Sequence, residues 1–230
     1  MSEERVRGEG FFLAIEGIEG SGKTTQVGRL EQALRATGRN VVVTKEPGGT
    51  QLGNRIRAIL LDPQEEGMDP LAELFLYAAS RRQHVAELIR PSLERGAVVL
   101  CDRFTDATLA YQGFGRMLEL DRLRQLNDWS TEGIRPDLTV ILDLPEALGL
   151  ERARARNAAE DLHGESRFEG EDVRFHRRVR EGYLTLAEAE PQRYLVIDAS
   201  GDPDAVFERL TSGLRERAPV LRLDPAASRS

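Results

Sequence analysis

The sequence predicts an α/β fold of three layers, in which a five-stranded parallel sheet carries helices on both faces. Five short apolar segments have the length of buried strands, and segments with helical spacing of apolar residues lie between them. This alternation is typical of parallel sheets, because the connection between parallel strands is usually a helix. A glycine-rich segment directly after the first strand is the third observation, since ligands of parallel sheets bind at such loops.

The first strand is expected at residues 11–15, and Val27, Leu30 and Leu34 predict the helix that follows it. Between them, residues 17–24 read GIEGSGKT, which fits the phosphate-binding spacing G-x-x-x-x-G-K-S/T. Strand, loop and helix in this order predict a P-loop NTPase-like fold. The residues expected to bind ATP are Gly17, Ile18, Glu19, Gly20, Ser21, Gly22, Lys23, Thr24 and Thr25.

This spacing has a physical reason. Glycines let successive backbone N–H groups turn inward and form a concavity for an anion at a helix N-terminus. Lys23 is expected to reach the β- and γ-phosphates, and Thr24 to place a hydroxyl on Mg²⁺. The alternative is a chance glycine-rich turn. The chain has only two lysines, and one of them falls on the fixed lysine of the motif, which favours the functional interpretation.

The second and third strands are expected at residues 41–44 and 97–101, both short, apolar and followed by polar loops. Residues 45–50, KEPGGT, are either a ligand-binding loop at a strand's carboxyl end or a plain Pro-Gly turn. Asp102 follows the third strand directly. An acidic residue there, in a P-loop protein, indicates a second contribution to the Mg²⁺ site.

A long helix is expected to begin at Asp69-Pro70 and to run through Leu88. Tyr77 and Arg81 are four residues apart, so they share one helix face and could hold a flat base. A core aromatic next to a surface arginine explains the same spacing, and the spacing alone favours that alternative. Further along, residues 105–116 are rich in small and hydrogen-bonding residues, where Gln112 offers an amide to a base edge.

The fourth strand is expected at residues 138–144 and the fifth at residues 194–198. Between them, a helix carrying Arg152, Arg154 and Arg156 leads into the polar segment 157–170. An arginine-bearing loop between helices has the shape of a lid over phosphates, although a solvated charged face is the default interpretation. Leu120, Leu123, Leu126 and Trp129 predict an amphipathic helix closed by Gly133, which is expected in packing or in subunit contact, and a last helix is expected at residues 202–214.

Composition narrows the function classes. The net charge of −7 argues against a nucleic-acid partner or an anionic membrane surface, and no apolar run approaches the ~18 residues of a membrane span. The single cysteine, Cys101, favours a reducing cytoplasm. We expect a disordered leader at residues 1–10, one domain at residues 11–217 with its lid at about 150–170, and a flexible tail at residues 218–230.

In this order, the segments IEGIEGSGKTTQ, TKEPGGT, the Tyr77-x-x-x-Arg81 pair, DRF with LAYQG after it, and FHRRVREGYL resemble the thymidylate kinase family. The resemblance implies transfer of the γ-phosphoryl of ATP to thymidine 5′-monophosphate, giving dTDP and ADP for dTTP synthesis. It also implies Mg²⁺ as cofactor and a homodimer. Another nucleoside monophosphate kinase, or a catalytically idle nucleotide-sensing module, are the alternatives.

The resemblance assigns Tyr77 to stacking on thymine and Arg81 and Gln112 to hydrogen bonds with the base, while Tyr111 crowds the 2′ position of the sugar. The family usually has phenylalanine where Tyr77 stands, and the added hydroxyl needs a partner. A second group of residues would surround the phosphates. Arg57 and Arg103 would clamp the acceptor phosphate, Glu46 and Pro47 would shape its pocket, and Glu19 would lie near sugar and phosphates.

The resemblance also points to the origin of the transition-state arginine. Some family members carry a basic residue inside the phosphate loop, and others take it from the lid. Gly20 occupies the loop position here, so the chain resembles the lid-arginine group of bacterial type, with Arg154 or Arg156 in that role. The catalytic residues implied are therefore Lys23, Arg103, Arg154, Arg156 and Glu19.

Overall fold

The structure is a computed structural model that describes residues 10–65, 67–159, 168 and 170–223. Five strands form one parallel sheet in the order β2-β3-β1-β4-β5. They are β1 (Phe11–Glu16), β2 (Val41–Lys45), β3 (Val98–Asp102), β4 (Leu138–Asp143) and β5 (Tyr194–Asp198). The predicted five-stranded parallel sheet is confirmed, and each strand begins or ends within one residue of its expected bounds.

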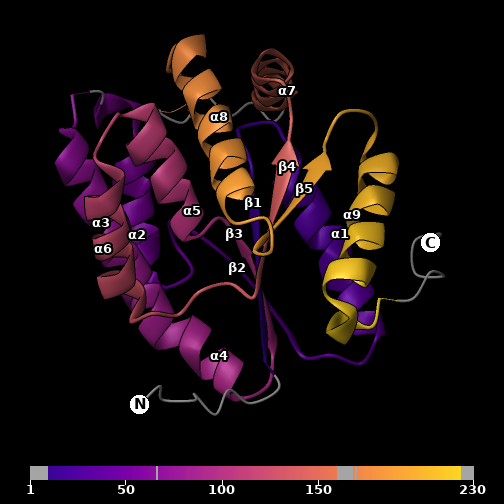
Figure 1. The fold of residues 1–230 in the computed structure, drawn as a ribbon. Coiled ribbons are helices and arrows are strands. Elements are labelled where there is room, and N and C mark those ends of the chain that lie inside the picture. The colour runs from indigo at the N-terminus through magenta and orange to yellow at the C-terminus, as the bar shows by residue number, and fades with distance from the viewer. Residues whose placement is uncertain (1–9, 66, 160–167, 169, 224–230) are drawn as a thin grey trace.

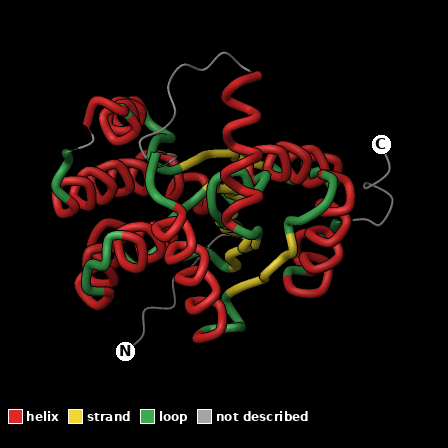
Figure 2. Tube along the Cα trace, turned by 90° about the horizontal axis from the view of Figure 1, so that it is seen from above, coloured by secondary structure: helices red, strands yellow, loops and turns green. Residues whose placement is uncertain are grey.

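Helices cover both faces of the sheet (Figures 1 and 2). Helices α1 and α9 pack on one face, and α3, α4, α5, α6 and α8 lie on the other. Their bounds are α1 (Lys23–Ala36), α2 (Gln51–Leu61), α3 (Pro70–His84), α4 (Arg90–Glu94), α5 (Thr105–Thr108), α6 (Leu120–Thr131), α7 (Glu146–Ala159), α8 (Val173–Ala189) and α9 (Pro203–Arg217). The described part of the chain contains no helix that combines the length and the apolar character needed to cross a membrane.

The strands bury both of their sides, which explains their continuous apolar sequences. In β1, Leu13 and Ile15 contribute to the core beneath α1 and α9, whereas Phe12 and Ala14 contribute to the core on the opposite face. All four side chains are fully buried. The alternation of a strand therefore divides one apolar run between two cores and fixes the register of the central strand.

Two segments expected to be regular or irregular on sequence grounds each contain a π-helical stretch. The helix predicted from Asp69 begins as expected, because the Asp69 side chain accepts hydrogen bonds from the backbone N–H groups of Leu71 and Ala72. After α3, however, a π-helical turn at Val85–Ile89 joins it to α4. A second π-helical stretch, Leu109–Gly115, follows α5 and carries the residues of the LAYQG segment. Such wide turns frequently occur at functional sites.

The start of the expected flexible tail is ordered, which corrects the prediction for residues 218–223. A 3₁₀ turn at Pro219–Leu221 follows α9, and Leu221 is fully buried in the core under α1 and α9. Leu223 is also buried in that core. Leu221 and Leu223 thus close the edge of this core with a single short turn and no further helix or strand within residues 218–223. Residues 1–9 and 224–230 lie outside the described residues.

We expect Leu221→Ala to lower the free energy of unfolding by about 2–4 kcal/mol, because it removes a buried side chain and leaves a cavity. Urea denaturation followed by circular dichroism measures this change. Val220→Ala is the matched control, since Val220 is 47% exposed and its truncation should change stability by well under 1 kcal/mol. Equal stability of both variants and the parent chain would contradict the ordered packing of this segment.

Candidate functional site

A cavity of about 1070 Å³ opens at the carboxyl ends of β1, β2 and β3. It brings together segments that are far apart in the chain, including the loop after β1, the loop after β2, helix α3 and the segment after β3. The predicted site residues that line it are Glu19, Gly20, Gly22, Lys23, Thr24, Thr25, Glu46, Pro47, Arg57, Tyr77, Arg81, Asp102, Arg103, Tyr111 and Gln112. Gly17, Ile18 and Ser21 belong to the same loop but do not line the cavity.

The loop between β1 and α1 has a backbone that only glycine accommodates easily. Gly17, Gly20 and Gly22 have φ angles of 143°, 70° and 87°, in the left-handed region that L side chains rarely adopt. A Cβ atom on Gly20 would also lie 2.0 Å from the carbonyl oxygen of Gly149 in α7. Position 20 therefore excludes a side chain for two independent reasons, and α7 packs directly on the phosphate loop.

Lys23 is held inside this loop. Its Nζ donates to the carbonyl oxygens of Gly17 and Ile18 at 3.0 Å and 2.7 Å and to Ser21 Oγ at 3.4 Å. Burial lowers the pKa of Lys23 to about 8, and the positive charge of Arg103 acts in the same direction. A partly desolvated ammonium group surrounded by neutral carbonyls gains strongly from an added anion. The loop thus presents one cation to the cavity.

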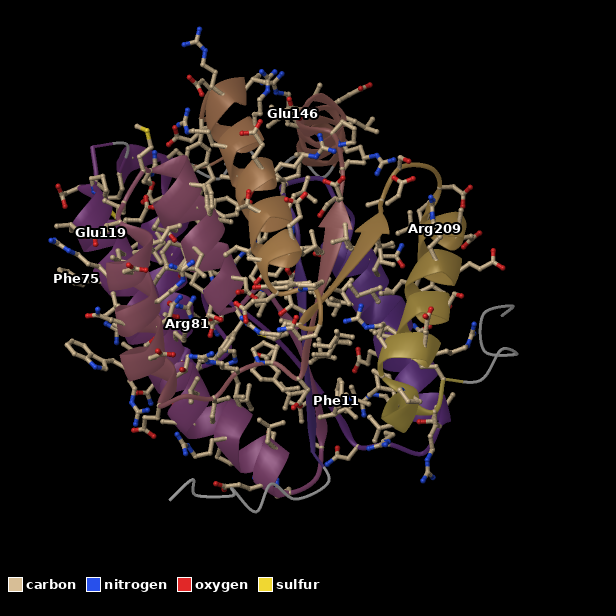
Figure 3. The ribbon with its side chains drawn as sticks, viewed as in Figure 1. Phe11, Phe75, Arg81, Glu119, Glu146 and Arg209 are labelled. Atoms are coloured by element: carbon tan, nitrogen blue, oxygen red, sulfur yellow. The ribbon has the colours of Figure 1, made fainter. Side chains whose placement is uncertain are left out.

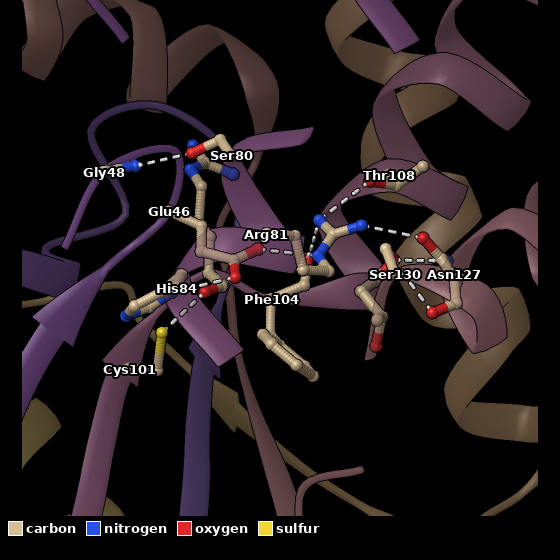
Figure 4. A network of polar contacts seen from close by, with 12 residues as sticks. Glu46, Gly48, Ser80, Arg81, His84, Cys101, Phe104, Thr108, Asn127 and Ser130 are labelled. Atoms are coloured by element: carbon tan, nitrogen blue, oxygen red, sulfur yellow. Dashed lines mark hydrogen bonds and ion pairs between the residues drawn. The ribbon is translucent and has the colours of Figure 1, made fainter. Parts of the chain in front are cut away.

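Arg81 is the centre of a buried polar network rather than a surface arginine (Figure 4). Its Nε donates to Glu46 Oε2 at 2.7 Å, and its Nη1 donates to Asn127 Oδ1 at 2.7 Å. Its Nη2 donates to Thr108 Oγ1 at 3.0 Å and to the carbonyl oxygen of Phe104 at 3.2 Å. Of its five N–H donors, these contacts use four, while the residue still lines the cavity.

Glu46 joins this network to strand β2 through a histidine. His84 Nδ1 lies 3.0 Å from Glu46 Oε1, and His84 Nε2 lies 2.7 Å from Thr44 Oγ1. Although burial opposes it, the charge of Arg81 and the contacts with His84 hold the pKa of Glu46 below its usual range. A carboxylate with partners on both oxygens fixes the loop after β2 against helix α3.

Aromatic side chains form one wall of the cavity. The ring of Phe168 lies 5.6 Å from that of Tyr111 and 6.5 Å from that of Tyr77, measured between centroids. Phe168 is buried and lines the cavity although it falls in the segment expected to be a polar lid. Next to this wall, Gln112 Nε2 donates to Glu73 Oε1 at 2.7 Å. A carboxylate only accepts hydrogen bonds, so this contact fixes the orientation of the Gln112 amide.

Arg103 lies between the phosphate loop and the aromatic wall. Its Nη2 donates to Glu19 Oε1 at 3.0 Å, and its guanidinium carbon lies 4.7 Å from the centroid of the Tyr111 ring. Tyr111 also donates its hydroxyl hydrogen to Glu19 at 2.7 Å. Although burial opposes it, contact with His176 and the charges of Arg103 and Lys23 hold the pKa of Glu19 below its usual range.

Glu16, at the last position of β1, is a fully buried carboxyl that the sequence interpretation missed. It accepts hydrogen bonds from the backbone N–H of Phe104 and from the Tyr183 hydroxyl, both at 2.7 Å. Burial raises the pKa of Glu16 to about 7, against the opposing charge of Arg103. Its sequence signal was an acidic residue closing an otherwise apolar strand, one position before the glycine-rich loop.

Other functional contacts were missed for related reasons. The partners of Arg81 on α5 and α6, Thr108 and Asn127, stand 27 and 46 residues from it, so no local pattern discloses them. Phe168 left a signal, as the single aromatic within the polar segment 157–170.

The predicted lid is described only in part. Arg152 donates to the carbonyl oxygens of Ala199 and Gly201, so it ties α7 to the segment after β5. Arg154 is exposed on α7 and does not line the cavity. Helix α7 extends to Ala159, past the expected end of the helix, and includes position 156. The side chain of Arg156 and residues 160–167 and 169 lie outside the described residues.

A parallel sheet with this glycine loop at the carboxyl end of its first strand defines a P-loop nucleotide-binding protein. Comparison with known families narrows the class, since the family model described as Thymidylate kinase matches residues 15–210. The chain belongs to the thymidylate kinase family.

Individual relatives agree with this assignment. A thymidylate kinase of Geobacter sulfurreducens is 54% identical over 210 residues, which cover 91% of this chain and 99% of the relative. One of Solidesulfovibrio magneticus is 57% identical over 199 residues, covering 86% and 95%. Among solved structures, the thymidylate kinase of Ehrlichia chaffeensis is 35% identical with a TM-score of 0.71, and the match covers 89% of this chain and 98% of that one.

The stability of the protein should depend on pH through Glu16. The pKa of Glu16 is about 7 in the folded chain, against 4.5 for an ordinary glutamate, the value taken for the unfolded chain. The contribution of Glu16 to the free energy of unfolding is therefore complete below pH 4.5 and is lost as pH rises through 7. Arg103, Asp106 and Tyr183 are the titratable groups that act on it most strongly, and it also interacts electrostatically with Lys23 and Cys101. Denaturant titrations at pH 5.5 and 8.5 should show that Glu16→Gln removes part of this decline, by an amount on the order of 1–3 kcal/mol. A parallel decline in both proteins would contradict the raised pKa.

Proposed function

We propose that the chain transfers the γ-phosphoryl group of ATP to thymidine 5′-monophosphate, giving dTDP and ADP, and so contributes to dTTP synthesis. One observation carries the proposal. A single cavity is lined by the phosphate loop, by Tyr77, Arg81 and Gln112, and by Arg103, which contacts both Glu19 of the loop and the Tyr111 ring. This arrangement supports the binding of a triphosphate and a nucleoside monophosphate with their phosphates facing each other.

The acceptor is already an oxyanion, so positioning and charge neutralisation supply most of the catalysis. In the mechanism we propose, Lys23 binds the β- and γ-phosphates and Arg103 and Arg57 hold the acceptor phosphate. The position of Arg57 supports this role, since Arg57 lines the cavity and donates to the carbonyl oxygen of Pro47 at 3.0 Å. Glu19 keeps Arg103 and Tyr111 in place and lies near the sugar of the acceptor.

The oxygen donors near the phosphate loop fit Mg²⁺. Thr24 is the second residue of α1 and Asp102 is the last residue of β3, and both line the cavity. Among the described residues, no group of three or more His, Cys, Asp or Glu side chains could hold a metal. Mg²⁺ is usually bound by one or two protein ligands together with substrate phosphates, so one hydroxyl and one carboxylate are a suitable donor set. The ion would neutralise charge on the transferred group.

In this proposal, the transition-state arginine is Arg154 or Arg156. Both belong to a lid at about residues 150–170, which is part of a single domain that starts at residue 11. Position 20 supports this origin, because its φ angle and the carbonyl oxygen of Gly149 exclude a basic side chain in the loop. Helix α7 contacts the phosphate loop through Gly149, so the start of the proposed lid lies next to that loop.

The base pocket favours a pyrimidine that donates at N3. Tyr77, Tyr111 and Phe168 provide aromatic surface for a flat ring. The bond to Glu73 uses one N–H of the Gln112 amide and fixes the orientation of that amide, so its carbonyl oxygen is available as an acceptor. Thymine offers an N–H at this edge where cytosine offers a lone pair.

A panel of acceptors with ATP and Mg²⁺ tests the proposed activity. We expect thymidine monophosphate to be preferred to cytidine and guanosine monophosphate by well over tenfold in kcat/KM. The methyl group should contribute only ~1–3 kcal/mol of discrimination against deoxyuridine monophosphate. Lys23→Ala is the control, which should abolish transfer and leave the circular dichroism spectrum unchanged. Equal rates for all acceptors would contradict the assignment of thymidine monophosphate as the substrate. No turnover with any acceptor would indicate a nucleotide-sensing module.

We further propose that the protein works in the cytoplasm as a homodimer. The single cysteine, Cys101, is a buried free thiol, which supports a reducing compartment. Helices α3 and α6 pack together and carry large exposed apolar side chains, among them Phe75 at 59% and Trp129 at 77% exposure. Phe75 points outward from α3 (Figure 3), where an apolar surface is costly to leave in water.

If these helices form the dimer interface, Phe75→Glu should shift the protein from dimer to monomer in sedimentation velocity at micromolar concentration. Desolvating the new carboxylate without a partner opposes association. Val220→Glu is the control, because Val220 is similarly exposed but lies beyond α9 on the other face of the sheet. A monomeric parent chain, or a Phe75 variant that stays dimeric, contradicts the proposal.

A further inference from the structure

We propose that Tyr183 and Glu16 are positioning residues that hold Arg103 in the orientation needed by the acceptor phosphate. The inference rests on the proposed function, in which Arg103 binds that phosphate. Neither Tyr183 nor Glu16 lines the cavity, so both would act only through Arg103.

The guanidinium of Arg103 is fixed from two sides. Its Nη2 donates to Glu19, and its Nη1 donates to the Tyr183 hydroxyl oxygen at 3.2 Å. The Tyr183 hydroxyl in turn donates to Glu16 Oε2 at 2.7 Å. This direction of donation runs from the arginine through the tyrosine hydroxyl to a buried carboxylate, so each group in the chain has a partner of the required kind.

The main chain of Arg103 is fixed by the same carboxylate. Arg103 has a φ angle of 73°, in the left-handed region that is unusual for a residue with a side chain. Directly after it, the backbone N–H of Phe104 donates to Glu16 Oε1 at 2.7 Å. Glu16 therefore holds the strained turn after β3 with one oxygen and the far end of the Arg103 side chain, through Tyr183, with the other.

Burial gives these contacts their rigidity. Tyr183 is 1% exposed and Glu16 is fully buried, so water cannot replace either hydrogen bond. They come from β1 and α8, two elements whose side chains are packed in the buried cores. A long arginine side chain normally samples many rotamers, and holding it in one before the substrate arrives reduces the entropy lost on binding.

Steady-state kinetics of Tyr183→Phe tests the inference. The variant removes the hydroxyl and keeps the ring, so we expect kcat/KM for thymidine monophosphate to fall about tenfold, mainly through KM, while KM for ATP stays within about twofold. Glu16→Gln is the second variant. Its amide can accept at only one position, so it should move the same parameter in the same direction.

Tyr194→Phe is the matched control. Tyr194 is also a buried tyrosine that donates to a buried carboxylate, Asp106, at 2.9 Å, but it has no contact with Arg103. It should lower the thermal midpoint about as much as Tyr183→Phe and leave the kinetics for both substrates unchanged. The same loss of kcat/KM in this control would show a general effect of stability and overturn the inference.

A double-mutant cycle with Arg103→Ala separates the inference from the proposed function. If Tyr183 acts through Arg103, adding Tyr183→Phe to Arg103→Ala should cause no further loss. A further tenfold loss would overturn the positioning role, as would unchanged kinetics of Tyr183→Phe or of Glu16→Gln. A parent chain that does not phosphorylate thymidine monophosphate, or an Arg103→Ala variant with full activity, would instead contradict the proposed function.

Discussion

The structure depends on the pairing of charges that are buried at the carboxyl end of the sheet. Arg81, Glu46 and Glu16 are almost inaccessible to water, and each has hydrogen-bonding partners from other elements. An unpaired charge in such a place would cost several kcal/mol, so the partners are as necessary as the charges themselves. Because those partners stand on α3, α5, α6 and α8, the pairing also determines how the helices on this face sit against the strands.

The same pairing prepares the cavity for anions. The phosphate loop concentrates backbone donors and Lys23 at the N-terminus of α1, and Arg103 and Arg57 line the same cavity. Folding already orders these side chains, so they need little rearrangement when a phosphate binds. This also explains how an acidic chain, with a net charge of −7, can bind two anionic nucleotides: the local arrangement of cations outweighs the distant negative charge.

Sequence and structure agree best where a function requires a local backbone shape. The phosphate loop was predicted from its glycine spacing, and the strand it follows, the helix it opens and the order of the elements all agree with the prediction. Agreement is weaker for Arg81, whose spacing with Tyr77 alone suggested a surface arginine. Its burial follows from Asn127 and Thr108, which meet it only after α3, α5 and α6 have packed. The ordered residues 219–223 escaped prediction for the same reason, because their burial depends on the core beneath α9.

By itself, the sequence determined the five strands and the glycine loop, because apolar runs and glycine positions act within a few residues of each other. Only the tertiary structure decided the strand order β2-β3-β1-β4-β5, the network around Arg81 and the connection from Arg103 through Tyr183 to Glu16. Glu16 and Tyr183 are 167 residues apart in the chain. Hydrogen bonds over such separations depend on the geometry of the packed core, which no local pattern of residues records.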